Sequence, residues 1–222
     1  MGHVLAIDQG TTSTRAIVFD EAGQPGASAS RPLNQIFPEP GWVEHDPDEI
    51  WRAVRDVCGA VVAEVGAANI SAIGITNQRE TTVVWDRATG APLYNAIVWQ
   101  DRRTAPLCQE LEREGWGAHI TAVTGLLIDP YFSATKLAWL LANVSGLREK
   151  AARGEVCFGT IDSFLLFKLT GGELHTTDAT NAARTMLFDI RKGLWDPQLL
   201  DRLAIPSDML PEVRDTLGDF GQ

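Results

Sequence analysis

Cysteine is scarce in this sequence: there are three among 222 residues, and none belongs to a CxxC pair. Cys58, Cys108 and Cys157 are widely separated along the chain. An odd, scattered set of cysteines does not build a disulfide framework and is typical of proteins in a reducing compartment. The sequence therefore predicts a cytoplasmic protein.

Long apolar runs and an excess of positive charge are also missing. No apolar stretch approaches the ~20 residues that a transmembrane helix needs. The first residues, MGHVLAID, lack the basic segment of a signal peptide. The formal net charge is −10, whereas proteins that bind a phosphate backbone carry basic surfaces. We therefore expect neither a membrane protein nor a nucleic-acid-binding protein.

Several common catalytic and nucleotide-binding motifs are absent. The sequence has no GxxxxGK[ST] loop, no GxGxxG after a strand and no GxSxG elbow. The four histidines, at positions 3, 45, 119 and 175, form no local cluster. These absences exclude a P-loop, a dinucleotide-binding fingerprint, a serine-hydrolase elbow and an HxxE-type metal pair.

What is present is an ordinary globular composition, with 45% apolar and 22% charged residues, enough for one large domain or two small ones. Apolar periodicity and turn residues predict strands at 4–7, 15–19, 27–33, 70–76, 81–85, 96–100 and 155–159. They predict helices from 46 onward, at 104–114, 133–143, 146–153 and 162–169, and around 197–203. A hairpin block followed by strands alternating with helices predicts an α/β fold with a sheet of mixed sense and flanking helices.

The clearest helix start lies at Asp46-Pro-Asp-Glu49. Asp46 is a candidate N-cap, Pro47 suits the first helical position, and Glu49 stands at the capping-box spacing. Apolar residues then recur at helical spacing, so one face of this helix should be buried.

A hydroxyl-rich turn, Asp8-Gln-Gly-Thr-Thr-Ser-Thr-Arg15, joins the first two predicted strands. Gly10 has no side chain to keep a phosphate from the backbone, so N–H groups there can bind an anion. Hydroxyl donors and a positive charge come from the next residues: Thr11, Thr12, Ser13 and Arg15. Asp8 is placed to hold Mg²⁺ through water. Hydroxyls that merely satisfy the turn explain the segment equally well.

The turn resembles the first phosphate motif of a superfamily that includes sugar kinases, actin and the heat-shock chaperone ATPases. These proteins share a ribonuclease H-like (actin-like ATPase) fold and bind ATP between two lobes. The resemblance implies the same fold class and an ATP site here. It is too widely shared to indicate a substrate.

Three downstream segments resemble a narrower group. GITNQRETT (74–82), NAIVWQDRRT (95–104) and IDPYFS (128–133) closely resemble segments of the glycerol kinases, within the FGGY family of carbohydrate kinases. The similarity runs in the expected order from Ala6 to about Gln222. It implies ATP-dependent phosphorylation of glycerol to glycerol 3-phosphate, with ATP and Mg²⁺ as cofactors.

The resemblance also implies roles for individual residues. It assigns Arg79, Glu80 and Tyr131 to glycerol and places Trp99 against its carbon backbone. It assigns four residues to the nucleotide phosphates: Thr11, Thr12, Ser13 and Arg15. Asp8 falls beside the metal, on the phosphate side of the catalytic centre.

The Arg79–Glu80 pair suits a polyol on chemical grounds as well. An arginine beside a glutamate offers donors and acceptors to two adjacent hydroxyls, in charge-assisted bonds of ~1.5–3 kcal/mol each. Adjacent strand residues point to opposite faces. Both can therefore reach one ligand only if the backbone beyond Thr76 is irregular. The alternative is a solvated ion pair on the surface.

Residues 1–222 are expected to form the N-terminal, substrate-binding lobe of such a kinase. Glycerol kinases similar to this chain place the catalytic aspartate just beyond its last residue and add a C-terminal lobe that grips adenine. The final residues, Gly218-Asp-Phe-Gly-Gln222, also show no helix cap or charged tail. We therefore expect a fragment that is inactive alone and pairs with the missing lobe. Kinases of the family often form dimers or tetramers, which favours a homo-oligomeric full-length protein.

Two other functions remain open at this stage. One is a kinase of the same family that acts on a ketopentose, gluconate or a similar sugar, although the run Asn77-Gln-Arg-Glu-Thr81 resembles glycerol kinases specifically. The other is a non-catalytic module, related to actin or the chaperones, that senses ATP and binds protein partners. A further possibility, compatible with the first hypothesis, is that the fragment only packs against its missing half.

Overall fold

The computed structural model describes residues 2–221, and the chain forms two compact units. The first comprises Met1–Ile36 and His45–Gln78, and the second comprises Phe37–Glu44 and Arg79–Gln222. The hydroxyl-rich turn lies in the first unit. The residues that the resemblance assigns to glycerol lie in the second.

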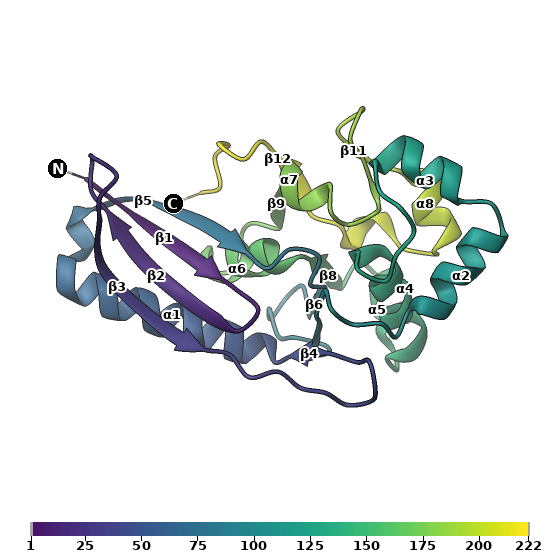
Figure 1. Ribbon diagram of the computed structural model, residues 1–222, viewed down its shortest axis with the longest axis horizontal. Coiled ribbons are helices and arrows are strands. Elements are labelled where there is room, and N and C mark those ends of the chain that lie inside the picture. The colour runs from purple at the N-terminus through teal and green to yellow at the C-terminus, as the bar shows by residue number, and fades with distance from the viewer. Residues whose placement is uncertain (1, 222) are drawn as a thin grey trace. The chain divides into compact units, whose positions relative to one another are not determined.

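The first unit is built on a four-stranded sheet of mixed sense (Figure 1). Its strands are β1 (His3–Gln9), β2 (Ser13–Phe19), β3 (Pro25–Pro32) and β5 (Ile70–Asn77), in the order β3-β2-β1-β5. β1 is antiparallel to β2 and parallel to β5, and β2 is antiparallel to β3. The predicted hairpin and mixed sheet are therefore confirmed.

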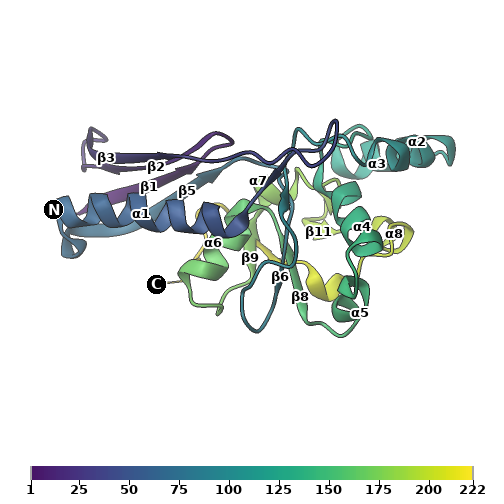
Figure 2. The same cartoon turned by 90° about the horizontal axis from the view of Figure 1, so that it is seen from below.

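Helix α1 (Pro47–Val65) lies along one face of this sheet, as Figure 2 shows. The inward-facing side chains Leu5, Ala16 and Val18 pack against Val57 and Val61 of the helix, and all five are buried. Alternation along the strands and helical spacing along α1 bring these apolar residues to one interface. The opposite face of the sheet carries the polar residues of the turn.

The capping box predicted for α1 is only half correct. Asp46 does cap the helix, because its Oδ1 accepts from the backbone N–H of Asp48 at 2.9 Å. Glu49 does not bond back to Asp46. Its Oε1 accepts from Nδ2 of Asn34 at 2.9 Å and from the Asn34 backbone N–H at 3.2 Å. A tertiary partner supplied by the preceding loop thus replaces the local one.

Short strands in pairs form the framework of the second unit. β6 (Val83–Asp86) is antiparallel to β8 (Val156–Gly159), β9 (Thr176–Asp178) is parallel to β12 (Glu212–Arg214), and β10 (Phe188–Asp189) is antiparallel to β11 (Leu194–Trp195). β4 (Glu44–His45) and β7 (Ala96–Ile97) have two residues each. The strand predicted at 96–100 is therefore too long, because a turn in which Asp101 N–H bonds to the Val98 carbonyl follows at once.

Helices surround these strands in the second unit. They are α2 (Ala105–Arg113), α3 (Gly117–Thr124), α4 (Ser133–Asn143), α5 (Leu147–Ala152), α6 (Ile161–Leu169), α7 (Ala179–Ala182) and α8 (Pro197–Arg202). α3 and α7 were not predicted. Two 3₁₀ turns, η1 (Ala67–Asn69) in the first unit and η2 (Ser207–Met209) in the second, complete the elements. Within residues 2–221, no helix has both the length and the apolar character needed to cross a membrane.

The core of the second unit gathers side chains from most of its helices. Fully buried members include Ile97, Ile120, Leu137, Leu140 and Phe158. Tyr131 is half-buried and packs on this same cluster. Tyr131, one of the predicted site residues, is therefore supported by the apolar core.

Candidate functional site

The turn between β1 and β2 presents polar groups on the face of the sheet that α1 does not cover. Asp8 lies directly opposite Arg15 in the antiparallel register, so both side chains leave the sheet on the same side. Both are exposed, and neither forms an ion pair with a described residue. Ser13 follows on the same face at a spacing of two residues. One carboxylate, one guanidinium and one hydroxyl are thus brought together at the end of the sheet.

Backbone hydrogen bonds hold the turn itself. The N–H of Gly10 donates to the carbonyl of Ser13 at 2.9 Å. A Cβ on Gly10 would stand 3.1 Å from that oxygen, so only glycine fits without displacement. Gln78 supports the turn, since its N–H donates to the Gln9 carbonyl at 2.7 Å and its Nε2 donates to Gln9 Oε1 at 3.1 Å. The turn is therefore preorganised beside Thr11 and Thr12.

The fit of a magnesium ion to this turn depends on Asp8. Within the described residues, no group of three or more His, Cys, Asp or Glu side chains could hold a metal ion. A single exposed carboxylate at the end of β1 suits Mg²⁺ that keeps most of its waters and takes its other ligands from phosphates. The donor set thus fits magnesium bound together with a nucleotide.

In the second unit, the backbone is irregular where the sequence predicted it. β5 ends at Asn77, and neither Arg79 nor Glu80 lies in a strand. Glu80 has a φ of 63°, in the left-handed region that non-glycine residues rarely adopt. The straight strand that would have contradicted the prediction is absent from the described chain. The two side chains are therefore free of the strict alternation of a strand.

Glu80 is buried, and its partner is an arginine from far along the chain. It is 2% exposed, and its Oε1 accepts from Nε of Arg184 at 2.6 Å. Arg79 is exposed and forms no ion pair or hydrogen bond with a described residue. The alternative of an exposed Arg79–Glu80 ion pair is therefore excluded.

The guanidinium of Arg184 also lies near a pair of aromatic rings. The rings of Trp99 and Tyr131 lie 5.3 Å apart with an interplanar angle of 56°. The guanidinium carbon of Arg184 lies 5.8 Å from the Tyr131 ring and 5.0 Å from that of Phe132. The structure thus brings Glu80, Trp99 and Tyr131 together, and Arg184 links the carboxylate to the aromatics.

Arg184 was not among the residues predicted from the sequence. It lies in the polar segment 176–185, which contains none of the candidate site residues named from the sequence. No local signal separates this arginine from a surface residue, because its partner lies about a hundred positions earlier in the sequence. The pairing of Arg184 with Glu80 is visible only in the folded structure.

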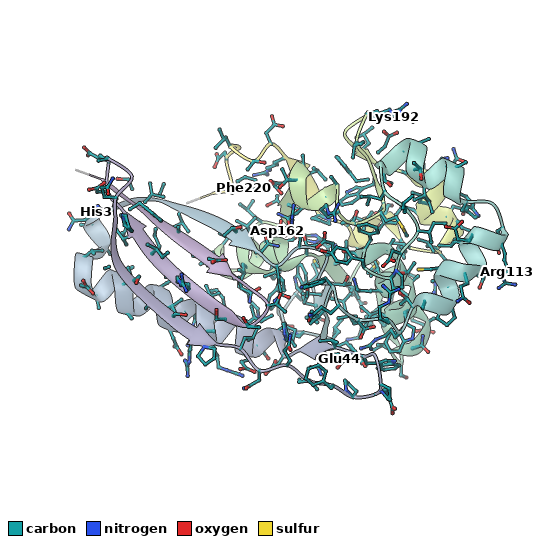
Figure 3. The ribbon with its side chains drawn as sticks, viewed as in Figure 1. His3, Glu44, Arg113, Asp162, Lys192 and Phe220 are labelled. Carbon is teal, nitrogen blue, oxygen red and sulfur yellow. The ribbon has the colours of Figure 1, made fainter. Side chains whose placement is uncertain are left out.

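The rest of that polar segment has structural duties. It forms β9 and α7, and Thr177 donates its hydroxyl to Asp162 at 2.6 Å. Asp162, labelled in Figure 3 at the start of α6, also accepts from Thr160 at 2.5 Å. Burial raises the pKa of the Asp162 carboxyl to about 6, against the lowering effect of these two hydroxyls. These hydroxyls serve a buried carboxyl rather than a ligand.

Comparisons with known proteins show the family of this chain. Residues 3–222 match the FGGY family of carbohydrate kinases, N-terminal domain. The chain belongs to the FGGY family of carbohydrate kinases. It is 60% identical to a glycerol kinase of Cereibacter sphaeroides, an alignment that covers 100% of this chain and 45% of the relative.

Solved structures of FGGY kinases have the same fold. The Plasmodium falciparum glycerol kinase with ADP matches with a TM-score of 0.94 and 38% identity, over 100% of this chain and 44% of that one. A ligand-bound xylulose kinase from Lactobacillus acidophilus matches with a TM-score of 0.87 and 27% identity, over 96% of this chain and 42% of that one. The predicted α/β, ribonuclease H-like (actin-like ATPase) fold is therefore confirmed. The chain spans a little under half the length of the relatives it matches.

Proposed function

We propose that this chain is the N-terminal, substrate-binding lobe of an ATP-dependent, cytoplasmic glycerol kinase, which converts glycerol to glycerol 3-phosphate. The observation that carries the proposal is the buried Glu80 carboxylate, which Arg184 connects to the Tyr131 ring and its neighbour Trp99. A polyol needs charge-assisted hydrogen bonds for its hydroxyls and apolar cover for its carbon chain. This part of the second unit supplies both.

Each residue of the second unit has a distinct proposed role. Glu80 accepts hydrogen bonds from glycerol hydroxyls, and its ion pair with Arg184 holds the carboxylate in one orientation. Arg79 donates to a glycerol oxygen, a role open to it because its guanidinium forms no ion pair with a described residue. Trp99 and Tyr131 cover the C–H face of the substrate and exclude water.

The first unit serves the phosphates in this proposal. The hydroxyls of Thr11, Thr12 and Ser13 donate to phosphate oxygens. The N–H of Gly10, which the sequence offered as a further donor, is bonded to the Ser13 carbonyl instead, so Gly10 contributes only the close approach that its missing side chain allows. Arg15 adds a positive charge. Asp8 holds a hydrated Mg²⁺, which when bound would neutralise charge on the phosphates.

Phosphoryl transfer also needs a base for the attacking hydroxyl. Glu80 is already paired with Arg184, and Asp8 lies beside the phosphate-binding turn. We propose that the base, a catalytic aspartate, and the remainder of the nucleotide site come from the part of the relatives that these residues do not span. Residues 1–222 alone are then inactive, and the complete protein is a homo-oligomer.

Another sugar kinase of the family is the second candidate. The structural likeness to a xylulose kinase supports it, but the identity there is 27%, against 60% with a glycerol kinase. A non-catalytic module related to actin or the chaperones has no support once membership of a carbohydrate kinase family is established. Glycerol is therefore the favoured substrate.

The test is the ATP-dependent phosphorylation of a panel of small polyols, pentoses and gluconate by the full-length protein that contains this chain. We expect turnover of glycerol, and a loss of at least 100-fold in kcat/KM in Arg79→Ala. Because Arg79 is exposed and unpaired among the described residues, this variant should keep the melting temperature of the unsubstituted protein.

Exposed Arg191 offers a matched control, since Arg191→Ala removes a similar charge elsewhere on the second unit. Its glycerol turnover should equal that of the unsubstituted protein. Preferred turnover of a pentose or gluconate would overturn the glycerol assignment but leave the kinase fold. Absence of phosphorylation across the whole panel would overturn the kinase proposal.

A further inference from the structure

Helix α4 carries a lysine whose side chain is completely buried. Lys136 is 0% exposed and lies next to the core residue Leu137. Lysine is almost never fully buried unless its charge is matched, because removing an ammonium from water costs several kcal/mol. The contacts of the buried ammonium must therefore offset this cost.

The ammonium of Lys136 donates to backbone carbonyls of two separate segments. Nζ lies 2.5 Å from the carbonyl oxygen of Tyr131, 3.3 Å from that of Phe132 and 3.3 Å from that of Glu80. An ammonium has three N–H donors and no acceptor. Three carbonyls therefore use all three donors of the ammonium. Through these bonds, Nζ of Lys136 joins the backbone at Glu80 to the backbone at Tyr131.

The backbone at Glu80 needs such support. A φ of 63° at a non-glycine residue costs about 1–3 kcal/mol and persists only when its surroundings hold it. The Glu80 carbonyl also accepts from the hydroxyls of Ser133 at 3.1 Å and Thr82 at 3.3 Å. Of these three donors, Lys136 is the one that also bonds to the Tyr131 carbonyl in the described chain. It therefore joins the backbone carbonyl of Glu80 directly to the backbone carbonyl of Tyr131.

We propose that Lys136 is a positioning residue for glycerol: it holds the Glu80 turn and the Tyr131 backbone in the arrangement that binds the polyol. This inference rests on the proposed function and deepens it. Lys136 acts through Glu80 and Tyr131, because its own side chain is fully enclosed and does not touch the substrate. A methionine of similar length would fill the same volume but would leave the three carbonyls without their shared donor.

The titration of Lys136 supplies an independent readout. Burial lowers the pKa of the Lys136 ammonium to about 7, while the facing carboxylates of Asp101, Glu80 and Asp129 and the Cys108 thiol act to raise it. A neutral amine has two donors for three carbonyls, so deprotonation must release one of these contacts. Binding that depends on the triple contact therefore weakens as the pH rises through this range.

The experiment compares Lys136→Met with Leu137→Ala in the full-length kinase. We expect Lys136→Met to raise the KM for glycerol at least tenfold and to leave the KM for ATP within twofold, because the turn beside glycerol loosens. Leu137→Ala removes a neighbouring core side chain of the same helix, which is also 0% exposed. It should lower the melting temperature and keep the KM for glycerol within twofold.

The outcomes separate positioning from packing. If both variants lose melting temperature and neither changes the KM for glycerol, Lys136 is a structural residue and the proposal is wrong. If Lys136→Met and Leu137→Ala raise the KM for glycerol by the same factor, the proposal is wrong as well. Absence of glycerol turnover in the unsubstituted protein would overturn the proposed function, and the role of Lys136 with it.

A pH profile keeps the test decisive if Lys136→Met does not fold. In the unsubstituted protein, we expect the KM for glycerol to rise at least threefold between pH 6 and pH 8.5, with the KM for ATP constant. The Leu137→Ala variant should show the same rise in the KM for glycerol, because the Lys136 ammonium is intact in that variant. A KM for glycerol that stays flat across this range would contradict the proposal.

Discussion

The pair formed by Glu80 and Arg184 is central to the polyol site that we propose in the second unit. Burying a carboxylate without a partner costs free energy of folding. A partner that bonds to both carboxylate oxygens, however, leaves no acceptor for a ligand. Arg184 contacts Glu80 through Nε on Oε1. Oε2 has no hydrogen bond within the described residues, and that oxygen is the acceptor we propose for a glycerol hydroxyl.

A double-mutant cycle tests this pair. Arg184→Gln should destabilise the protein by about 1–3 kcal/mol, since it leaves Glu80 buried and unpaired. Adding Glu80→Gln to that variant should recover part of the loss, which gives a coupling free energy of about 1–3 kcal/mol. Denaturant unfolding of the four proteins measures it.

The control for this cycle is an exposed arginine–glutamate pair. Arg153 and Glu155 lie 2.7 Å apart with both side chains about half exposed. Solvent screens such a pair, so Arg153→Gln should leave the unfolding midpoint unchanged. A coupling between Glu80 and Arg184 as small as that of the exposed pair would show that burial does not strengthen their interaction.

At the scale of elements, the junction of β8 with α6 depends on a glycine. A Cβ on Gly159 would stand 2.5 Å from the Ser163 Cβ and 2.9 Å from the ring of Trp85. Trp85 is fully buried and packs against Phe164 at 5.4 Å between ring centroids. Neither neighbour can withdraw without disturbing the core.

Gly159→Ala should therefore destabilise the protein by about 1–3 kcal/mol through overpacking. Gly59→Ala is the matched control, because Gly59 lies inside α1 and a Cβ there meets nothing within 4 Å. That variant should stabilise the protein by about 0.5–1 kcal/mol, since alanine favours the helix. Denaturant midpoints of both variants test the contrast, and a neutral Gly159→Ala would contradict the packing argument.

At the scale of the whole molecule, buried titratable groups set the response of stability to acid. Burial lowers the pKa values of His175 and His45 to about 4, from the ordinary value of 6.5. The unfolded chain then takes up a proton before the folded one, so stability falls as the pH decreases from 6.5 towards 4. Asp162 acts in the opposite sense, because its raised pKa favours the protonated folded state below about pH 6.

The histidine contribution can be isolated with His175→Gln. Glutamine can still donate to the Phe158 carbonyl that the His175 ring nitrogen contacts at 2.7 Å, but it does not titrate. Between pH 7.5 and pH 5, the unsubstituted protein should lose about 1–2 kcal/mol more stability than the variant. Denaturant unfolding at both pH values measures this difference. Parallel pH profiles would show that His175 does not contribute.

Elements with strong local signals were predicted closely. The hairpin of β1 and β2, α1 with Asp46 and Pro47 at its start, and α4 follow from alternation, capping chemistry and helical spacing, all of which act over a few residues. The strand predicted at 96–100 was too long, and α3 was missed. At 96–100 a local turn, closed by the Asp101 N–H on the Val98 carbonyl, ends the strand early, whereas α3 packs Ile120 into the core without a strong local pattern.

The candidate site divides in the same way. The turn from Asp8 to Arg15 was recognisable because its residues are adjacent in the sequence, and the irregular backbone at Glu80 followed from the demand that neighbouring side chains share one ligand. Arg184 and Lys136 gave no such signal. Their roles arise from a carboxylate and from carbonyls that approach them only after the chain has folded.

The sequence by itself determined the mixed α/β pattern, the polar turn and the resemblance to the FGGY carbohydrate kinases, because each depends on residues within a short window. The tertiary structure alone decided that Glu80 pairs with Arg184 rather than with its neighbour Arg79. It also decided that the ammonium of Lys136 lies buried against the carbonyls of Glu80 and Tyr131. Burial changes the free energy of a charge by several kcal/mol, and burial is a property of the folded chain rather than of any segment.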